Sequence, residues 1–189
     1  MTPQQEEAER LTEVTLYTDG GCDPNPGAGG YGAVLVCEGQ TKEISGGFKL
    51  TTNNRMEIFA AIAGLETLTG PCHVTLVSDS RYLVDAMTLS WAKRWRKNGW
   101  WRTKRERAVN TDLWERLLTL CERHRVAFEW VKGHAGHEQN ERCDALAMTA
   151  LKSPDLPADE GYECPNCKAT YRVDEAKRTV DTVQTLFDL

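Results

Sequence analysis

Residues 17–35 read YTDGGCDPNPGAGGYGAVL, and this stretch decides which fold we expect. Apolar and polar side chains alternate over residues 14–19, which predicts a strand. Residues 20–30 contain five glycines and two prolines, so we expect them to form a loop. Residues 31–37 are apolar and predict a second strand, which a hairpin turn over 38–41 connects to a third.

The rest of the chain alternates between helical and extended patterns. In chain order, the predicted elements after the second strand are a strand over 42–48, a helix over 53–68, a strand over 73–78, a two-piece helix over 81–97, a helix over 110–124, a strand over 126–131 and a last helix over about 138–151. An antiparallel meander followed by strands that helices separate predicts an α/β layered domain with a mixed sheet.

Length and composition bound the organisation of the chain. Its 189 residues suit one compact domain of about 140 residues with extensions. We expect that domain over 14–151, an acidic extension over 1–13, and a tail over 152–189 whose start is marked by Pro154 and Pro157. The sequence has no apolar run of about 18 residues and no signal peptide, so we expect a cytoplasmic protein without a membrane span, and a monomer.

The chain has seven cysteines, an odd number for a disulfide framework. Without a secretion signal, the five isolated cysteines are interpreted as reduced thiols, several of them buried. Cys164 and Cys167 form the sequence CPNC, which is half of a four-ligand zinc site. The sequence leaves three states open for this pair: Zn²⁺ shared with a second chain or completed by a distant residue, a redox pair, or an unligated turn.

Positive charge gathers in one segment, although the net charge of the whole chain is −5. Eight basic residues lie between positions 93 and 107, and only Glu106 interrupts them. A local cluster of this kind is typical of a surface that binds a polyanion. The eight residues are Lys93, Arg94, Arg96, Lys97, Arg102, Lys104, Arg105 and Arg107.

Acidic residues stand at the ends of two predicted strands. Asp19 ends the first strand and Asp79 directly follows the fourth, so the two lie side by side if those strands are neighbours. Glu57, in the first turn of a helix, and Asp144, in the last helix, could join them. Four converging carboxylates repel one another, and a divalent cation removes that repulsion; oxygen ligands favour Mg²⁺ or Mn²⁺ over zinc. Any one of these acids alone is typical of a solvated surface charge, so the hypothesis depends on their joint position.

Several motifs occur in the order found in type 1 ribonucleases H, the family that residues 14–150 resemble. These motifs are YTDGGCDPNPGAGGYGAVL (17–35), TTNNRMEIFAAIAGLE (51–66), SDSRYLV (78–84), NTDLWERL (110–117) and VKGHAGHEQNERCDALA (131–147). The resemblance implies a ribonuclease H-like fold, with a five-stranded mixed sheet flanked by helices. It also implies hydrolysis of the RNA strand of RNA–DNA hybrids with two Mg²⁺ ions, or Mn²⁺ in their place, leaving 5′-phosphate and 3′-hydroxyl ends. The metal ligands carried over are Asp19, Glu57, Asp79 and Asp144.

The resemblance extends to residues around these carboxylates. His134, in a glycine-rich loop, would transfer protons and assist product release. Asn25 and the loop that begins at Cys22 would contact the RNA strand.

Further polar residues would read the hybrid. Asn53 and Asn54 would read the minor groove, and Thr52 with Asn53 would hold a DNA phosphate; the alternative for Thr52 and Asn53 is helix N-capping. Arg81 stands where many relatives carry Gln, so its contact to the hybrid would add a charge.

The basic segment resembles the family's substrate-binding handle. Lysine and arginine bind phosphates, and a tryptophan can pack under a deoxyribose. We expect Trp91 and Trp95 to be mainly structural, and one of Trp100 and Trp101 to lie at the surface. The handle residues expected to bind substrate are Lys93, Arg94, Arg96, Lys97, Trp100 and Trp101.

The chain ends in QTLFDL, Gln184 to Leu189, which resembles the short peptides that bind a bacterial sliding clamp. The alternative is a short amphipathic helix that packs on the domain. Two other functions were weighed against hybrid cleavage: a hybrid-binding module without catalysis, which would not need the four acids, and a nuclease acting on DNA, against which Asn25, Asn53 and Asn54 argue.

Overall fold

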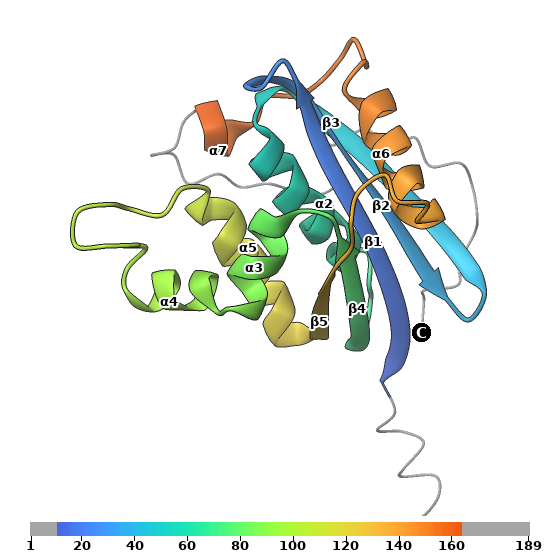
Figure 1. The fold of residues 1–189 in the computed structure, drawn as a ribbon, viewed down its shortest axis with the longest axis horizontal. Helices are drawn as coiled ribbons and strands as arrows, with labels where there is room; N and C mark the ends of the chain where they lie inside the picture. The colour runs from blue at the N-terminus through green and yellow to red at the C-terminus, as the bar shows by residue number, and fades with distance from the viewer. Residues whose placement is uncertain (1–10, 164–189) are drawn as a thin grey trace, which may run out of the picture.

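The computed structural model describes residues 11–163, which form one five-stranded mixed sheet covered by helices (Figure 1). The sheet order is β3-β2-β1-β4-β5, with β1 antiparallel to β2 and parallel to β4, as the sequence predicted. The strands are β1 (Thr12–Asp23), β2 (Gly27–Cys37), β3 (Gln40–Thr51), β4 (Cys72–Ser78) and β5 (Arg125–Trp130). Most of the acidic extension, the Cys164–Cys167 pair and the terminal peptide lie outside the described residues.

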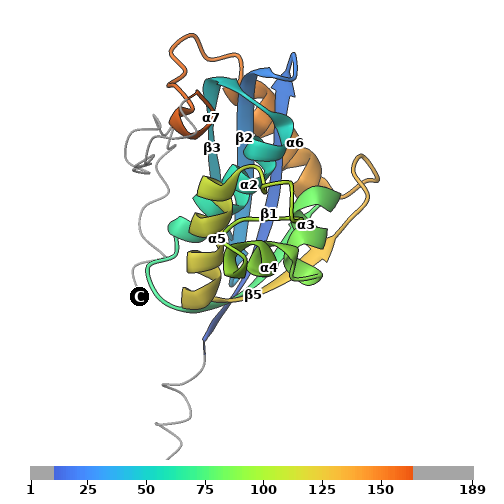
Figure 2. The same ribbon diagram turned by 90° about the vertical axis from the view of Figure 1, so that its left-hand side faces the viewer.

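Helices cover both faces of the sheet. One face carries α2 (Asn53–Glu66), and α5 (Thr111–Arg123) packs against α2; the other face carries α6 (Glu138–Ala150). Figure 2 turns the first face toward the viewer, with α3 (Arg81–Thr88), α4 (Trp91–Lys97) and α5 in front of the sheet. The two-piece helix expected over 81–97 is thus confirmed as α3 and α4. None of the helices within the described residues combines the length and the apolar character needed to cross a bilayer.

The glycine-rich loop expected over residues 20–30 was wrong, because most of these residues belong to the sheet. β1 continues to Asp23 and β2 begins at Gly27, with Gly20 paired to Tyr31 and Gly21 to Gly30. Only residues 24–26 form a turn. Glycine is a poor strand former in isolation, but its backbone makes the same ladder hydrogen bonds as any residue. Tertiary packing therefore overrides the local preference.

The glycines are required because helices approach the sheet closely from both sides. A Cβ atom built on Gly20 would lie 2.4 Å from the carbonyl carbon of Met56 in α2. On the other face, a Cβ on Gly30 would lie 2.1 Å from the carbonyl oxygen of Ala147 in α6, and one on Gly32 would lie 2.2 Å from that of Cys143. Real Cβ atoms do not approach this near, so these positions admit no side chain.

Helix α2 is buried on nearly all sides. Every residue from Arg55 to Leu65 is buried except Glu57. One side of α2 faces the sheet, and α5 covers the outer side with side chains such as Trp114, which is fully buried. Burial on both sides leaves Glu57 as an exception that its position at the sheet edge has to explain.

The Arg55 cluster, made of Arg55, Asp112, Asp159 and Thr51, joins α2 to the segment after α6. Arg55 is 2% exposed, and its Nη1 and Nη2 donate to the two oxygens of Asp112 at 3.0 and 2.7 Å. Its Nε and Nη2 also donate to the carboxylate of Asp159, at 2.7 and 2.8 Å. Asp159 is 1% exposed and accepts a further bond from the Thr51 hydroxyl at 2.6 Å. Because every charge in the cluster has an opposite partner, its burial is tolerated.

Residues 152–163 therefore contact the sheet domain. The amide of Lys49 in β3 donates to the carbonyl of Pro157 at 2.9 Å, and the short helix α7 (Glu160–Glu163) follows directly after Asp159. The boundary expected after residue 151 stays a prediction, but the first part of the tail is packed against β3 and α2.

Replacing Gly30 with alanine tests the close approach of α6. We expect the free energy of unfolding to fall by about 2–3 kcal/mol, because the new methyl group would push α6 away from β2. The measurement is chemical denaturation. Gly21→Ala is the matched control. Gly21 lies on β1 and pairs with Gly30 of β2, but a Cβ on Gly21 would meet nothing within 4 Å. Equal stability of the two variants would contradict the packing argument.

Replacing Asp159 with asparagine tests the Arg55 cluster. We expect a loss of about 3 kcal/mol in the free energy of unfolding, because the buried guanidinium loses one of its two anionic partners. Glu160→Gln removes a neighbouring but exposed charge and is expected to change stability by less than about 0.5 kcal/mol. Thermal and urea unfolding of both variants measure the difference, and an Asp159→Asn protein as stable as the control would refute the assignment.

Candidate active site

Asp19 and Asp79 lie side by side at one end of the sheet. β1 and β4 run parallel, and their last paired residues are Thr18 and Ser78. Asp19 directly follows Thr18, and Asp79 directly follows Ser78. The parallel register therefore brings both carboxylates to the same edge of the sheet. The first and fourth strands are neighbours, so the condition for Asp19 and Asp79 to lie side by side is met.

Glu57 and Asp144 come to this edge from the helices on opposite faces of the sheet. The backbone nitrogen of Glu57 lies 2.6 Å from the point where Gly20 would carry a Cβ, which places the start of α2 directly over the residue after Asp19. Asp144 follows Cys143, whose carbonyl contacts Gly32, and Gly32 is the β2 partner of Asp19. The two helices therefore approach β1 from opposite sides at the same level.

The carboxylates act on one another electrostatically. Burial raises the pKa of Asp19 to about 7, and the charges of Asp79, Asp144 and Glu57 add to that rise, against a hydrogen bond from the Gly20 amide at 2.7 Å. Burial also raises the pKa of Glu57 to about 7, with a further contribution from Asp79. Burial and mutual repulsion thus both disfavour the ionised forms of these acids at this edge of the sheet.

Asp79 lies near two further polar side chains, His134 and Asn140. Burial raises the pKa of Asp79, while the charge of His134 and the side-chain amide of Asn140 oppose that rise. A Cβ on Gly133 would lie 2.4 Å from Asp79 Oδ2, so the loop that carries His134 passes directly against this carboxylate. His134 itself has a positive φ of 52°, a conformation that holds the loop in a tight turn. The sequence-predicted histidine is thus beside the acids.

The four carboxylates do not form a closed cage. Within residues 11–163, no three His, Cys, Asp or Glu side chains are arranged so that they could hold a metal ion as they stand. The chemistry of the groups nevertheless suits a hard divalent cation, since all four are oxygen donors and two have pKa values raised by burial and like charge. Residues 11–163 therefore provide oxygen donors that suit such a cation, but not an arrangement already closed around one.

Three residues of the site were not identified from the sequence. Ser80 donates a hydrogen bond to Glu57 Oε2 and accepts one from the Leu83 amide at 3.2 Å, so it caps α3 and orients Glu57 at once. Asn140 is 2% exposed and lies four residues before Asp144, on the same face of α6; among the described residues, its amide nitrogen has no partner at ordinary hydrogen-bond geometry. The third residue is Trp130, whose indole N–H donates to the Asp79 carbonyl at 2.9 Å.

Signals for two of these residues were available in the sequence. Serine before a helix is a cap signature, and Asn140 stands at helical spacing from an acid already singled out. Nothing local marks Trp130, because its contact depends on the pairing of β5 with β4.

The residues expected to read substrate gather at the start of α2. The side-chain oxygen of Asn53 accepts a hydrogen bond from the backbone amide of Cys22 at 2.6 Å. The backbone amide of Asn53 donates to Asn25 Oδ1 at 3.3 Å. Thr52 caps α2 by accepting from the Arg55 amide at 3.4 Å, so the capping alternative holds for Thr52 but not for Asn53. Asn54 is exposed. The turn between β1 and β2 is therefore tied to the helix that carries Glu57.

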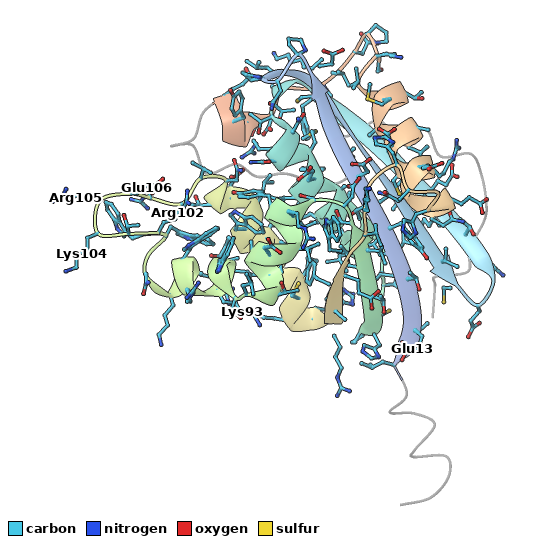
Figure 3. All side chains as sticks on the ribbon, in the orientation of Figure 1. Glu13, Lys93, Arg102, Lys104, Arg105 and Glu106 are labelled. Atoms are coloured by element: carbon cyan, nitrogen blue, oxygen red, sulfur yellow. The ribbon has the colours of Figure 1, made fainter. Side chains whose placement is uncertain are left out.

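The basic segment projects from the body of the molecule. In Figure 3, Arg102, Lys104 and Arg105 lie around the tip of the loop between α4 and α5. Trp100 packs against the core while Trp101 is 42% exposed, which confirms that one of the two lies at the surface. Arg96 pairs with Glu122 at 2.5 Å, so its charge is partly neutralised.

Trp91 and Trp95 also pack against the core, as expected. Lys93, Arg94 and Lys97 are exposed. The segment thus presents free lysine and arginine side chains outside a tryptophan-rich support.

Comparison with known proteins connects this arrangement to one family. The family model for RNase H matches residues 11–152. The chain is 62% identical over 151 residues to the ribonuclease H of Rippkaea orientalis, a match that covers 80% of this chain and 93% of the relative.

Solved structures share the fold. LC9-RNase H1, described as a type 1 RNase H with the type 2 active-site motif, has a TM-score of 0.67 at 30% identity, covering 81% of this chain and 80% of that one. LC11-RNase H1, solved in complex with an RNA/DNA hybrid, has a TM-score of 0.57 at 27% identity, covering 73% of this chain and 96% of that one.

Proposed function

Because this chain belongs to the RNase H family, a family of nucleases, we propose that it hydrolyses the RNA strand of RNA–DNA hybrids. The observation that carries the proposal is the convergence of acids from β1, β4, α2 and α6 on one sheet edge, where each pKa shift found includes a contribution from another of these acids. Excess buried negative charge beside a polyanionic substrate is unfavourable unless a cation joins it. A divalent cation that binds both the carboxylates and a substrate phosphate would meet this requirement.

Divalent cations, Mg²⁺ or Mn²⁺, would be held by Asp19, Glu57, Asp79 and Asp144. When bound, such ions supply positive charge that activates a water molecule and stabilises the leaving oxygen in phosphodiester hydrolysis. The chain's own contribution is to bring four oxygen donors together from four elements and to orient them. Ser80 holds the Glu57 carboxylate through its hydroxyl.

His134 and Asn140 would serve the same reaction through Asp79. Both favour the ionised form of the Asp79 carboxylate, which keeps it a donor for cations. His134 lies in an exposed loop, so its imidazole can exchange protons between the site and bulk water. We propose that it accepts or returns a proton during hydrolysis and product release, leaving 5′-phosphate and 3′-hydroxyl ends.

Discrimination of RNA from DNA would come from the turn between β1 and β2 and the start of α2. The 2′-hydroxyl group of ribose both donates and accepts hydrogen bonds, so it is read by amides and backbone groups at fixed positions. Cys22, Asn25 and Asn53 are joined by hydrogen bonds, and Asn54 stands exposed beside them. This network holds the reading groups in place, while Thr52, with Asn53, would contact a DNA phosphate.

The tail is assigned no role in hydrolysis. A sliding-clamp contact through residues 184–189 and zinc at Cys164 and Cys167 remain predictions, because both lie outside the described residues. Titration of a purified clamp with and without residues 184–189, and metal analysis of the whole protein, address them separately.

Asp79→Asn is expected to abolish cleavage while preserving binding. The substitution keeps the size of the side chain but removes the central charge, so we expect kcat on an RNA–DNA hybrid to fall by at least about a thousandfold. Hybrid affinity should change little, since most binding energy comes from phosphate contacts elsewhere. Gel-based cleavage and fluorescence anisotropy measure the two quantities.

Glu38→Gln provides the control, because Glu38 is an exposed acid on the hairpin between β2 and β3. The unmodified protein should cut RNA–DNA, but neither RNA–RNA nor DNA–DNA duplexes, with Mg²⁺ or Mn²⁺ and not with a chelator. Binding of hybrids without cleavage would favour a binding module, and cleavage of DNA duplexes would favour a different nuclease.

Removing charge from the protruding loop tests the handle. We expect Lys104→Ser with Arg105→Ser to weaken hybrid binding and to reduce the slope of log affinity against log salt by up to about 2, because each phosphate contact releases a counterion. Lys49→Ser with Lys152→Ser removes two exposed charges outside the basic segment and should leave the slope unchanged. Identical slopes for the two double variants would contradict a handle at this loop.

A further inference from the structure

Trp130 contacts two residues of the site with different parts of its indole ring. The face of the ring lies under the guanidinium of Arg81, with Arg81 Cζ 3.5 Å from the ring centroid. The ring nitrogen donates to the carbonyl of Asp79 at 2.9 Å. The pairing of Trp130 with Ser78 across β5 and β4 places the ring at the sheet edge where the carboxylates converge.

Arg81 is held by this stacking and by little else. It is exposed and is the first residue of α3. Its side chain makes no hydrogen bond or ion pair with residues 11–163, so within this part of the chain its guanidinium N–H groups have no acceptor. A guanidinium stacked on an indole keeps its donor fork free at the edge of the plane, since the stack occupies only one face.

The position of Arg81 places its free guanidinium N–H groups where a substrate phosphate would pass. It lies two positions after Asp79, and the one residue between them, Ser80, holds Glu57. A phosphodiester that approaches the carboxylates with its cations carries its neighbouring backbone phosphates past the same edge. Arginine recognises phosphate through two parallel N–H···O bonds.

We propose that Trp130 is a positioning residue that holds Arg81 as a preorganised binding fork for a backbone phosphate of the hybrid, next to the bond that is cut. This inference rests on the proposed function; beyond the hybrid contact that the resemblance implies for Arg81, it identifies a backbone phosphate as the group bound and Trp130 as the support. The indole face fixes the direction of the guanidinium, and the indole N–H fixes the main chain of Asp79. The phosphate contact and the catalytic carboxylate are thereby held at a constant separation.

A phosphate contact predicts a salt effect that a purely structural role does not. Binding is measured in an Asp79→Asn background, so that the hybrid stays intact. We expect Arg81→Gln to weaken hybrid binding about tenfold at moderate salt and to lower the salt slope by about 1. Arg81→Lys should restore the slope but not the full affinity, because lysine keeps the charge and loses the fork. An unchanged slope in Arg81→Gln overturns the proposal.

Substitutions of Trp130 test the support. Trp130→Leu should weaken binding about threefold, and combining it with Arg81→Gln should give no more loss than Arg81→Gln alone, because both changes remove the same contact. Trp130→Phe keeps an aromatic face and should weaken binding less than Trp130→Leu. The stacking role would be refuted if the loss of hybrid affinity in the double variant equalled the product of the two single losses. Equal losses of affinity in Trp130→Phe and Trp130→Leu would also refute it. Unfolding transitions first establish that each Trp130 variant is folded. If Trp130→Leu is not folded, Trp130→Phe alone is combined with Arg81→Gln in the double-mutant cycle.

A control and a reference separate this inference from the proposed function. Arg125→Gln removes one exposed positive charge at the opposite end of β5 and should leave the slope unchanged. The unmodified protein is assayed for hybrid cleavage beside the variants. Absence of cleavage would overturn the proposed function, whereas cleavage together with an unchanged slope in Arg81→Gln would overturn only the Arg81 contact.

Discussion

The structure depends on the close approach of two helices to a glycine-lined part of one strand pair. Gly20, Gly30 and Gly32 leave no room for a side chain, because the backbones of α2 and α6 occupy that space. The carboxylate of Asp19 stands between these contacts, and Glu57 and Asp144 arrive on the helices themselves. The same constraint thus packs the domain and assembles the proposed active site, so that a change in helix distance would disturb both.

Charge is distributed unequally along the first turn of α2. Arg55, on one side of the helix, has two carboxylate partners and is fully enclosed. Burial raises the pKa of Glu57, two residues later, and the charge of Asp79 adds to that rise against the hydrogen bond from the Ser80 hydroxyl. Within the described residues, the buried positive charge of Arg55 is therefore paired, whereas Glu57 has no cationic partner. This is the pattern expected where a site gives up stability for function.

Much of the fold could be predicted from the sequence, because hydrophobic periodicity is local. The strands and helices followed from alternation and element order, whereas the adjacency of Asp19 and Asp79 depended on a strand pairing that the sequence left conditional. Residues 20–30 were misjudged because the requirement for glycine comes from α2 and α6, which are distant in the chain. Arg55 and Trp130 escaped notice for the same reason: their partners are set by tertiary packing.

The Arg55 cluster extends beyond the segment that the family model matches. The family match ends at residue 152, whereas the carboxylate that completes the cluster is Asp159. A chain trimmed to the homologous region would retain all four acids of the proposed site and expose a guanidinium built for enclosure. Measured on such a fragment, heat tolerance would understate that of the intact protein even if its chemistry were unaffected.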